Sequence, residues 1–195
     1  MKVTLLHHSP LWLIEHGARV CTNTEDKLES CEVTPGMQDF IQKLIDRGHH
    51  SVLEHVTYTF YIEGVSRALL QELARHRVGM SLSVQSTRWA LKKILAQDTD
   101  IYLPDKLTKD DNREAELCIG QCLAMADYLQ KQYGNDVAKY VLPECITTTL
   151  QLTCNARSLN HLFALRSNPP ALREFNELCM AMDDALPEEH KFMYM

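Results

Sequence analysis

The spacing of apolar residues along the chain predicts a mixture of strands and helices. Residues 2–7 alternate weakly and suit an opening strand, and two further segments, 56–62 and 147–154, are rich in β-branched and aromatic residues. Apolar residues recur at helical spacing in the segments 10–21, 35–48, 110–133, 137–141, 157–165 and 172–186. Because these elements do not alternate as regular βαβ units, we expect an α+β fold with a mixed or antiparallel sheet and packed helices. The length favours a single domain over residues 1–195.

Several residues predict where the middle elements begin and end. Gly64 is expected to end the 56–62 strand, and Ser66 is a suitable N-cap for a helix that runs into Arg75. On that helix Arg67, Gln71 and Arg75 would form a polar stripe at i, i+4 and i+8. The segment 81–95 is predicted to be extended.

The segment 75–88 concentrates the chemistry of the chain. Arg75, His76 and Arg77 place three cationic or potentially cationic side chains in a row, and Ser86 and Arg88 follow. The net charge is −6, so this cluster opposes the overall charge. Arginine forks match phosphate geometry, and hydroxyl and backbone N–H groups add neutral donors. The pattern predicts a site for phosphorylated small molecules; the alternative is a helix C-terminus that collects cations because of the helix dipole.

The spacing within this cluster suits two ligands rather than one. If Arg75 and Arg77 end a helix, their side chains point about 200° apart and reach different partners. In an extended segment Ser86 and Arg88 would point to the same face. We therefore interpret the segment as a junction between two ligands.

Composition excludes several classes of protein. No window approaches the roughly 18 uninterrupted apolar residues of a membrane span, and the N-terminal apolar run is too short for a signal peptide. The negative net charge argues against general binding to nucleic acid. The seven cysteines include no Cys-x-x-Cys pair, which argues against a disulfide framework and a structural zinc site. We expect a soluble cytoplasmic protein.

A metal site is not predicted either. His49, His50, Glu54 and His55 lie close in sequence, but their spacing is not that of a His-Glu-x-x-His motif. His55 is expected to be half-buried just before the strand.

Three segments together resemble the flavin-dependent thymidylate synthases. The signature of that family is Arg-His-Arg, about seven residues, then Ser with an Arg two positions further on. Here Arg75-His76-Arg77 is followed by eight residues and then by Ser86 and Arg88, which leaves the alignment of 78–85 open by one position. The stretch 49–55 resembles the upstream motif of the family, and 155–159 with Leu165-Arg166 resembles its C-terminal motif. The order and the intervals also agree, so the resemblance spans most of the chain.

The resemblance implies an activity. It implies conversion of dUMP to dTMP, with methylenetetrahydrofolate as carbon donor and NADPH as reductant through FAD. It also implies a homotetramer with active sites shared between subunits. Arg166 would be catalytic, because a fixed cation beside the uracil ring favours ionisation at N3.

The resemblance also implies which residues bind each ligand. FAD would contact Ser51, Arg75, His76, Arg77, Asn155, Arg157 and His161. The nucleotide dUMP would contact Gln71, Glu72, Arg75, Gln85, Ser86, Thr87, Arg88, Lys139 and Arg166. Lys139 stands where the family commonly has Arg, His161 where it often has Asn, and either Gln71 or Glu72 can take the position of a Gln near the nucleotide.

Simpler interpretations of individual residues stay open, as do other functions. Asn155 could simply cap the helix that follows it, and Arg166 could be a helix-end cation that faces water. Alternative functions are a flavin-dependent methylase of another uracil nucleotide such as UMP, a non-catalytic flavin- or nucleotide-binding protein, and a nucleic-acid-binding module. The last would require steeply salt-dependent binding.

Overall fold

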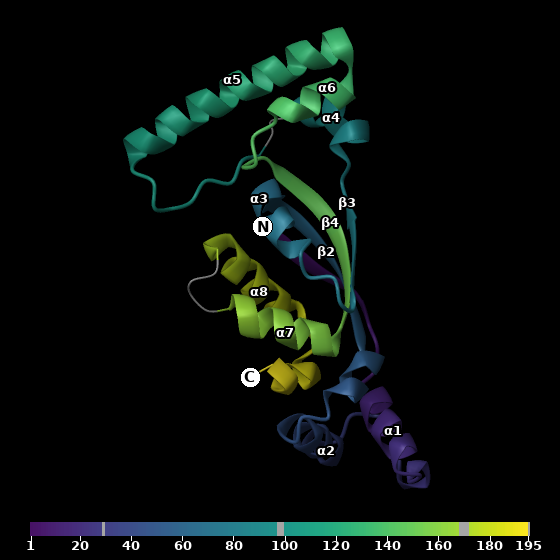
Figure 1. Cartoon of the computed structure of the whole chain (residues 1–195). Helices are drawn as coiled ribbons and strands as arrows, with labels where there is room; N and C mark the ends of the chain where they lie inside the picture. The colour runs from purple at the N-terminus through teal and green to yellow at the C-terminus, as the bar shows by residue number, and fades with distance from the viewer. Residues whose placement is uncertain (29, 97–99, 168–171, 195) are drawn as a thin grey trace. The chain divides into compact units, whose positions relative to one another are not determined.

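The chain folds into helices and strands in the order predicted for an α+β protein (Figure 1). The computed structural model describes residues 1–28, 30–96, 100–167 and 172–194. Short 3-10 turns, η1 to η4, occupy Glu25–Lys27, His50–His55, Lys139–Val141 and Glu188–Tyr194. The helices and strands are β1 (Lys2–His8), α1 (Trp12–Cys21), α2 (Pro35–Asp46), β2 (Thr57–Ser66), α3 (Arg67–Leu73), β3 (Met80–Val84), α4 (Thr87–Ala96), α5 (Lys109–Tyr133), α6 (Asn135–Ala138), β4 (Thr147–Asn155), α7 (Ala156–Arg166) and α8 (Arg173–Ala185).

The four strands form an antiparallel sheet in the order β1-β2-β4-β3. Between β2 and β4, the hydroxyls of Thr59 and Thr153 lie 3.0 Å apart, and the Ala156 N–H donates to the Val56 carbonyl at 2.8 Å. Residue numbers therefore fall on one strand as they rise on the other. The predicted antiparallel alternative is confirmed.

The chain forms two compact units. The first comprises Met1, Glu63–Arg75 and Ser83–Leu150, and the second comprises Lys2–Ile62, His76–Leu82 and Gln151–Met195. Strands β2, β3 and β4 each contribute residues to both units. The single domain expected over residues 1–195 stays a prediction.

Helix α5 is the longest element of the first unit, and it packs with α4 and α6 (Figure 1). The Thr108 side chain accepts the Asp111 N–H at 3.2 Å, and the Asp111 carboxylate accepts the Thr108 N–H at 3.4 Å. This reciprocal capping box fixes the start of the helix. The predicted helix over 110–133 is confirmed.

Helices α7 and α8 lie side by side in the second unit (Figure 1). Apolar residues of α7, α8 and β2 are buried, among them Phe60, Leu159, Phe175 and Leu178. The predicted helices over 157–165 and 172–186 agree with α7 and α8 to within two residues at each end. Helix α7 carries most of the C-terminal motif.

A buried polar chain ties the C-terminal turn η4 to the second unit. The Tyr194 hydroxyl donates to the Tyr58 hydroxyl at 3.1 Å, and the Tyr58 hydroxyl lies 2.8 Å from Nδ1 of His190. Burial, with a smaller contribution from the neighbouring His8, lowers the pKa of His190 to about 4, and Glu189 opposes this shift. The neutral imidazole is therefore the form that fits this site.

The prediction that Gly64 ends the strand is wrong, because β2 continues through it to Ser66. Gly64 adopts a φ of +75°, a left-handed conformation that glycine tolerates without a steric penalty. Ser66 does cap the next helix, since its hydroxyl accepts the Leu69 N–H at 3.0 Å. That helix, α3, ends at Leu73, so the predicted polar stripe does not reach Arg75.

The prediction that 81–95 is extended is also wrong beyond β3. Strand β3 ends at Val84, and the Ser86 carbonyl accepts the Ala90 N–H at 2.9 Å, which opens α4. Leu91, one turn into α4, is fully buried, so tertiary packing supports the helix. Ser86 and Arg88 therefore do not share a face by strand alternation.

Candidate active site

The Arg-His-Arg signature begins in the turn after α3. Arg75 is exposed, and its Nη1 lies 3.4 Å from a carboxylate oxygen of Glu72 in the same unit. Since α3 ends two residues earlier, the 200° separation expected for a helix does not apply to Arg75 and Arg77. Arg75 is the last residue of its segment in the first unit, and His76 begins the next segment of the second unit.

The two candidates for the nucleotide-facing position on α3 differ in their partners. Gln71 is exposed, and its amide nitrogen donates to the Glu144 carboxylate at 2.9 Å. Glu72 is less exposed and pairs with Arg75. A carboxylate beside Arg75 competes with a ligand phosphate for the same guanidinium.

Arg88 is held by the start of α6 in the first unit. Its Nε lies 3.0 Å from Oδ1 of Asp136, and the Asn135 amide donates to its backbone carbonyl at 2.6 Å. The side chains of Arg88 and Asp136 are 64% and 56% exposed. An ion pair this exposed contributes about 0–1 kcal/mol, so a stronger anion can displace the carboxylate.

The other predicted nucleotide contacts surround the start of α4 or lie in η3. Gln85 and Ser86 are exposed, while Thr87 is half-buried at the first position of the helix. The Gln85 N–H donates to the Thr149 carbonyl at 2.9 Å. Lys139 is half-buried, with its Nζ 5.5 Å from the ring centroid of Tyr140, a cation–π distance.

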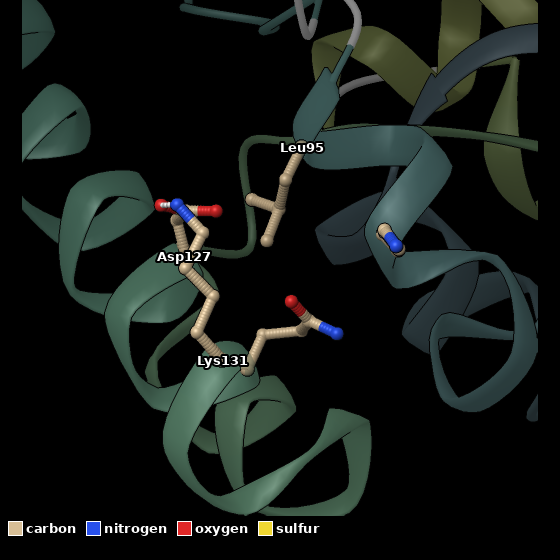
Figure 2. Close-up of a pocket in the computed structure, with 5 residues that line it drawn as sticks. Leu95, Asp127 and Lys131 are labelled. Atoms are coloured by element: carbon tan, nitrogen blue, oxygen red, sulfur yellow. Dashed lines mark hydrogen bonds and ion pairs between the residues drawn. The ribbon is translucent and has the colours of Figure 1, made fainter.

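A pocket opens further along α4, between that helix and α5 (Figure 2). Its volume is about 400 Å³, and Leu95 of α4 faces Asp127 and Lys131 of α5. Lys131 pairs with Asp127 at 2.6 Å. Lys92 and Gln130 complete the described lining, which includes none of the predicted site residues.

The upstream motif lies in η2 of the second unit. Ser51 is exposed. The Glu54 carboxylate forms an ion pair with Arg157, with Oε1 and Nη1 2.7 Å apart. This pair joins the upstream motif to the first turn of α7, 103 residues later in the chain. His55 is exposed, so the prediction that it is half-buried is wrong, because it ends a 3-10 turn before β2 begins.

The signature is bonded to the start of α7 within the second unit. Asn155 caps α7, since its Oδ1 accepts the Ser158 N–H at 2.8 Å, which confirms the capping prediction. The Ser158 hydroxyl donates to the Val78 carbonyl at 2.8 Å, and the Asn155 N–H donates to the Gly79 carbonyl at 3.1 Å. Gly79 has a φ of +64°, and a Cβ there would lie 2.3 Å from the Ser158 hydroxyl. Only glycine fits this turn.

Arg166 contacts the central residue of the signature. Its Nε donates to Nε2 of His76 at 3.2 Å, and its guanidinium lies 4.9 Å from the ring centroid of Phe175. Both Arg166 and His76 are half-buried, so Arg166 does end its helix as a cation but packs against two side chains instead of facing water alone. Phe175 is not among the predicted site residues, because an aromatic residue on the apolar stripe of α8 carries no signal beyond core packing.

The donors of the second unit fit the chemistry of FAD. Arg77, Arg157 and His161 are exposed, and Ser51 adds an exposed hydroxyl. Guanidinium groups suit the diphosphate of FAD, and hydroxyl, amide and imidazole groups suit its neutral polar atoms. These residues, with His76 and Asn155, would hold the cofactor.

Three cysteine thiols are poorly suited to act as nucleophiles. Burial raises the pKa of Cys154 to about 12 and that of Cys179 to about 11. Burial likewise raises the pKa of Cys145. A raised pKa lowers the fraction of the reactive thiolate.

The described residues, which leave out 29, 97–99, 168–171 and 195, contain neither a metal-binding cluster nor a membrane-spanning helix. In that part of the chain, no group of three or more His, Cys, Asp and Glu is placed to hold a metal ion. Within the same residues, no helix combines the length and apolar character needed to cross a membrane.

The chain is similar to known proteins over its whole length. A family model described as thymidylate synthase complementing protein matches residues 4–190. A flavin-dependent thymidylate synthase from Campylobacter jejuni (strain RM1221) is 42% identical over 206 residues, which cover 100% of this chain and 96% of that protein. One from Wolinella succinogenes is 38% identical over 205 residues, covering 100% of this chain and 97% of the relative.

Solved structures agree with these matches. The crystal structure of thymidylate synthase X from Helicobacter pylori with FAD and dUMP has a TM-score of 0.86 at 32% identity, covering 100% of this chain and 97% of that one. A UMP/dUMP methylase from Streptomyces cacaoi shares the fold, with a TM-score of 0.81 at 22% identity over 99% of this chain and 94% of that one. The resemblance in the three motifs is confirmed, and the chain belongs to the flavin-dependent thymidylate synthase family.

Proposed function

We propose that this chain converts dUMP to dTMP with methylenetetrahydrofolate as carbon donor and NADPH as reductant through FAD. The Helicobacter pylori structure, which contains FAD and dUMP, supports these two ligands. The observation that carries the proposal is the hydrogen bond between Arg166 and His76. Its Nε and Nε2 atoms lie 3.2 Å apart, although the two residues are 90 positions apart in the sequence. It joins the C-terminal motif to the signature.

The first unit supplies most of the proposed dUMP contacts. Arg75, Arg88 and Lys139 would bind the phosphate as cations. Arg75 and Arg88 now pair with exposed carboxylates at 3.4 and 3.0 Å, and such pairs are weak enough for a phosphate to replace. A phosphate dianion offers the bidentate geometry that favours arginine. The remaining proposed contacts are neutral or acidic groups, namely Gln71, Glu72, Gln85, Ser86 and Thr87.

The second unit supplies every proposed FAD contact except Arg75, which lies in the first unit. When bound, FAD carries reducing equivalents from NADPH to the methylation step. Asn155 uses its side-chain oxygen to cap α7, which leaves its amide nitrogen available as a donor. Arg157 would exchange its exposed ion pair with Glu54 for a phosphate oxygen. The full proposed set is Ser51, Arg75, His76, Arg77, Asn155, Arg157 and His161.

Arg166 would stabilise negative charge on the uracil ring. A guanidinium is permanently cationic, so it can stabilise charge at N3 without gaining or losing a proton. Its contacts with His76 and Phe175 restrict its rotamers before substrate binds. A cation fixed in place before the reaction is worth more than one that reorganises.

We further propose a homotetramer with shared active sites, since the proposed ligand contacts lie on many short elements. Light scattering on the FAD-loaded protein would measure its mass. The cytoplasmic location stays a prediction that cell fractionation would test.

The experiment is chromatographic detection of dTMP from the FAD-loaded protein with dUMP, methylenetetrahydrofolate and NADPH. The control omits NADPH, and a parallel reaction replaces dUMP with UMP. NADPH-dependent dTMP is the expected result. Methylation of UMP but not dUMP would overturn the substrate, and bound flavin without methylation of either would indicate a binding protein.

A further inference from the structure

We propose that Phe175 is a positioning residue that holds the guanidinium of Arg166 in the orientation that the reaction needs. This inference rests on the catalytic role proposed for Arg166. Phe175 lies on α8, outside the three motifs, and contacts Arg166 of the C-terminal motif and His76 of the signature. Its importance would come entirely through Arg166 and His76.

Three side chains form the contact within the second unit. The Arg166 guanidinium carbon lies 4.9 Å from the Phe175 ring centroid, within cation–π distance. The His76 ring meets the same phenyl ring at 5.9 Å and 66°. The Arg166 Nε donates to His76 Nε2 at 3.2 Å and closes the triangle. Each of the three side chains therefore touches the other two.

Helix α8 holds Arg166 at two points. Phe175 is fully buried, so its ring is fixed by the core of the second unit. The next residue, Asn176, donates its side-chain amide to the backbone carbonyl of Arg166. One helix thus fixes both the main chain and the side chain of the residue that ends α7.

The hydrogen bond also fixes the form of His76. An arginine Nε can only donate, so His76 Nε2 must accept, and the imidazole is neutral with its proton on Nδ1. Phe175 packs against both partners and so maintains their alignment. An arginine side chain otherwise samples many rotamers, and restricting them beforehand lowers the entropic cost of reaching the transition state.

The competing explanation is that Phe175 is only a core residue. A core role predicts lower stability after truncation but normal turnover by the molecules that remain folded. A positioning role predicts a loss of turnover that depends on Arg166. The experiment must therefore measure kcat per FAD-loaded, folded enzyme.

The first test compares Phe175→Leu with Phe163→Leu in the holoenzyme. Phe163 is also buried in the second unit, but its aromatic partner is Tyr194. We expect Phe175→Leu to lower kcat about tenfold, with the KM for dUMP changed less than about threefold, because the half-buried Arg166 guanidinium loses its cation–π contact. Phe163→Leu should leave kcat within about twofold at a temperature where both variants are folded.

Two further variants separate positioning from packing. Phe175→Tyr keeps the aromatic face and should restore kcat to within about threefold of the original enzyme. Adding Phe175→Leu to Arg166→Ala should cause no further loss of kcat, because residues that act through one another are not additive.

Each outcome decides between named alternatives. Equal kcat losses for Phe175→Leu and Phe163→Leu, equal losses for Phe175→Leu and Phe175→Tyr, or an additive loss with Arg166→Ala would overturn the positioning role. If Arg166→Ala itself keeps full turnover, the catalytic role in the proposed function fails first. If Arg166→Ala is inactive while Phe175→Leu keeps full turnover, only the inference about Phe175 fails.

Discussion

Arg75 and Arg88 of the first unit are held in the opposite way to Arg166 of the second unit. In the first unit Arg75 and Arg88 pair with carboxylates, with arginine side chains that are 71% and 64% exposed. In the second unit Arg166 is half-buried against an aromatic ring and a neutral imidazole. Other arginines of the second unit resemble Arg75 and Arg88: Arg157 pairs with Glu54 and Arg173 with Glu177, with arginine side chains that are 53% and 55% exposed.

The difference concerns how easily each arginine changes partner. An exposed ion pair is worth about 0–1 kcal/mol, so a phosphate can take the place of the carboxylate at little cost. A cation packed on an aromatic ring keeps its position because moving it would expose both groups. Exchangeable arginines suit ligand capture, and a fixed arginine suits stabilisation of charge during the reaction.

Arg166→Ala should have the largest effect on catalysis. We expect kcat for dTMP formation to fall by about 10²- to 10³-fold, as for loss of one preorganised electrostatic group. Steady-state kinetics of the FAD-loaded enzyme would measure it, with Arg166→Lys as a variant that keeps the charge. Turnover within twofold of the original enzyme would remove the distinction between fixed and exchangeable arginines.

The buried polar chain in the second unit should make stability depend on pH. The pKa of His190 is lowered to about 4 in the folded protein, so between pH 6.5 and 4 the unfolded chain binds the extra proton. The contribution of His190 to the free energy of unfolding is complete above pH 6.5 and is lost as the pH falls through 4. It amounts to about 3 kcal/mol of the free energy of unfolding.

Urea denaturation at several pH values would test this, with His190→Gln as the comparison. The difference in free energy of unfolding between the two proteins should shrink from pH 7 toward pH 4.5. A difference that stays constant across that range would contradict the assignment to His190.

Arg88→Ala should weaken binding of dUMP rather than the chemical step. We expect the Kd to rise by about 10- to 150-fold, since hydrogen bonds to charged groups contribute about 1.5–3 kcal/mol. Calorimetric titration of the oxidised holoenzyme would measure it. Arg113→Ala, an exposed arginine on α5, is the control, and an equal loss in both variants would indicate a general effect of charge.

The smallest effect is expected for Asp136→Asn. Because its ion pair with Arg88 is exposed, we expect the Kd for dUMP to change less than about threefold and the free energy of unfolding by less than about 0.5 kcal/mol. Thermal unfolding and the same titration would measure both. A tenfold weaker Kd would mean that the carboxylate orients Arg88 rather than merely neutralising it.

The local signals in the sequence predicted the caps well. Ser66 and Asn155 each accept an N–H three residues later, and such a contact depends only on nearby residues. The start of α4 was missed because the burial of Leu91 is a tertiary effect. Gly64 was misassigned because its left-handed backbone can bend a strand without ending it.

In the candidate site, too, local features could be predicted from the sequence and tertiary contacts could not. The motifs could be found because their residue types and spacing lie in short segments. The contact of Phe175 with Arg166 and His76 could not be predicted from the sequence. Phe175 lies on another helix, and phenylalanine is a common residue in a protein core. Which residues contact each ligand stays a prediction.

The turn at Gly79 has a consequence for how this chain can vary. Val78 is 88% exposed, whereas a Cβ at Gly79 would overlap Ser158 and Asn155. In a library randomised at both positions and selected for growth without thymidine, position 78 should accept many residues and position 79 almost only glycine. The positive φ of Gly79 and the side chains packed against it thus restrict position 79 to glycine, while the neighbouring position 78 stays free to vary.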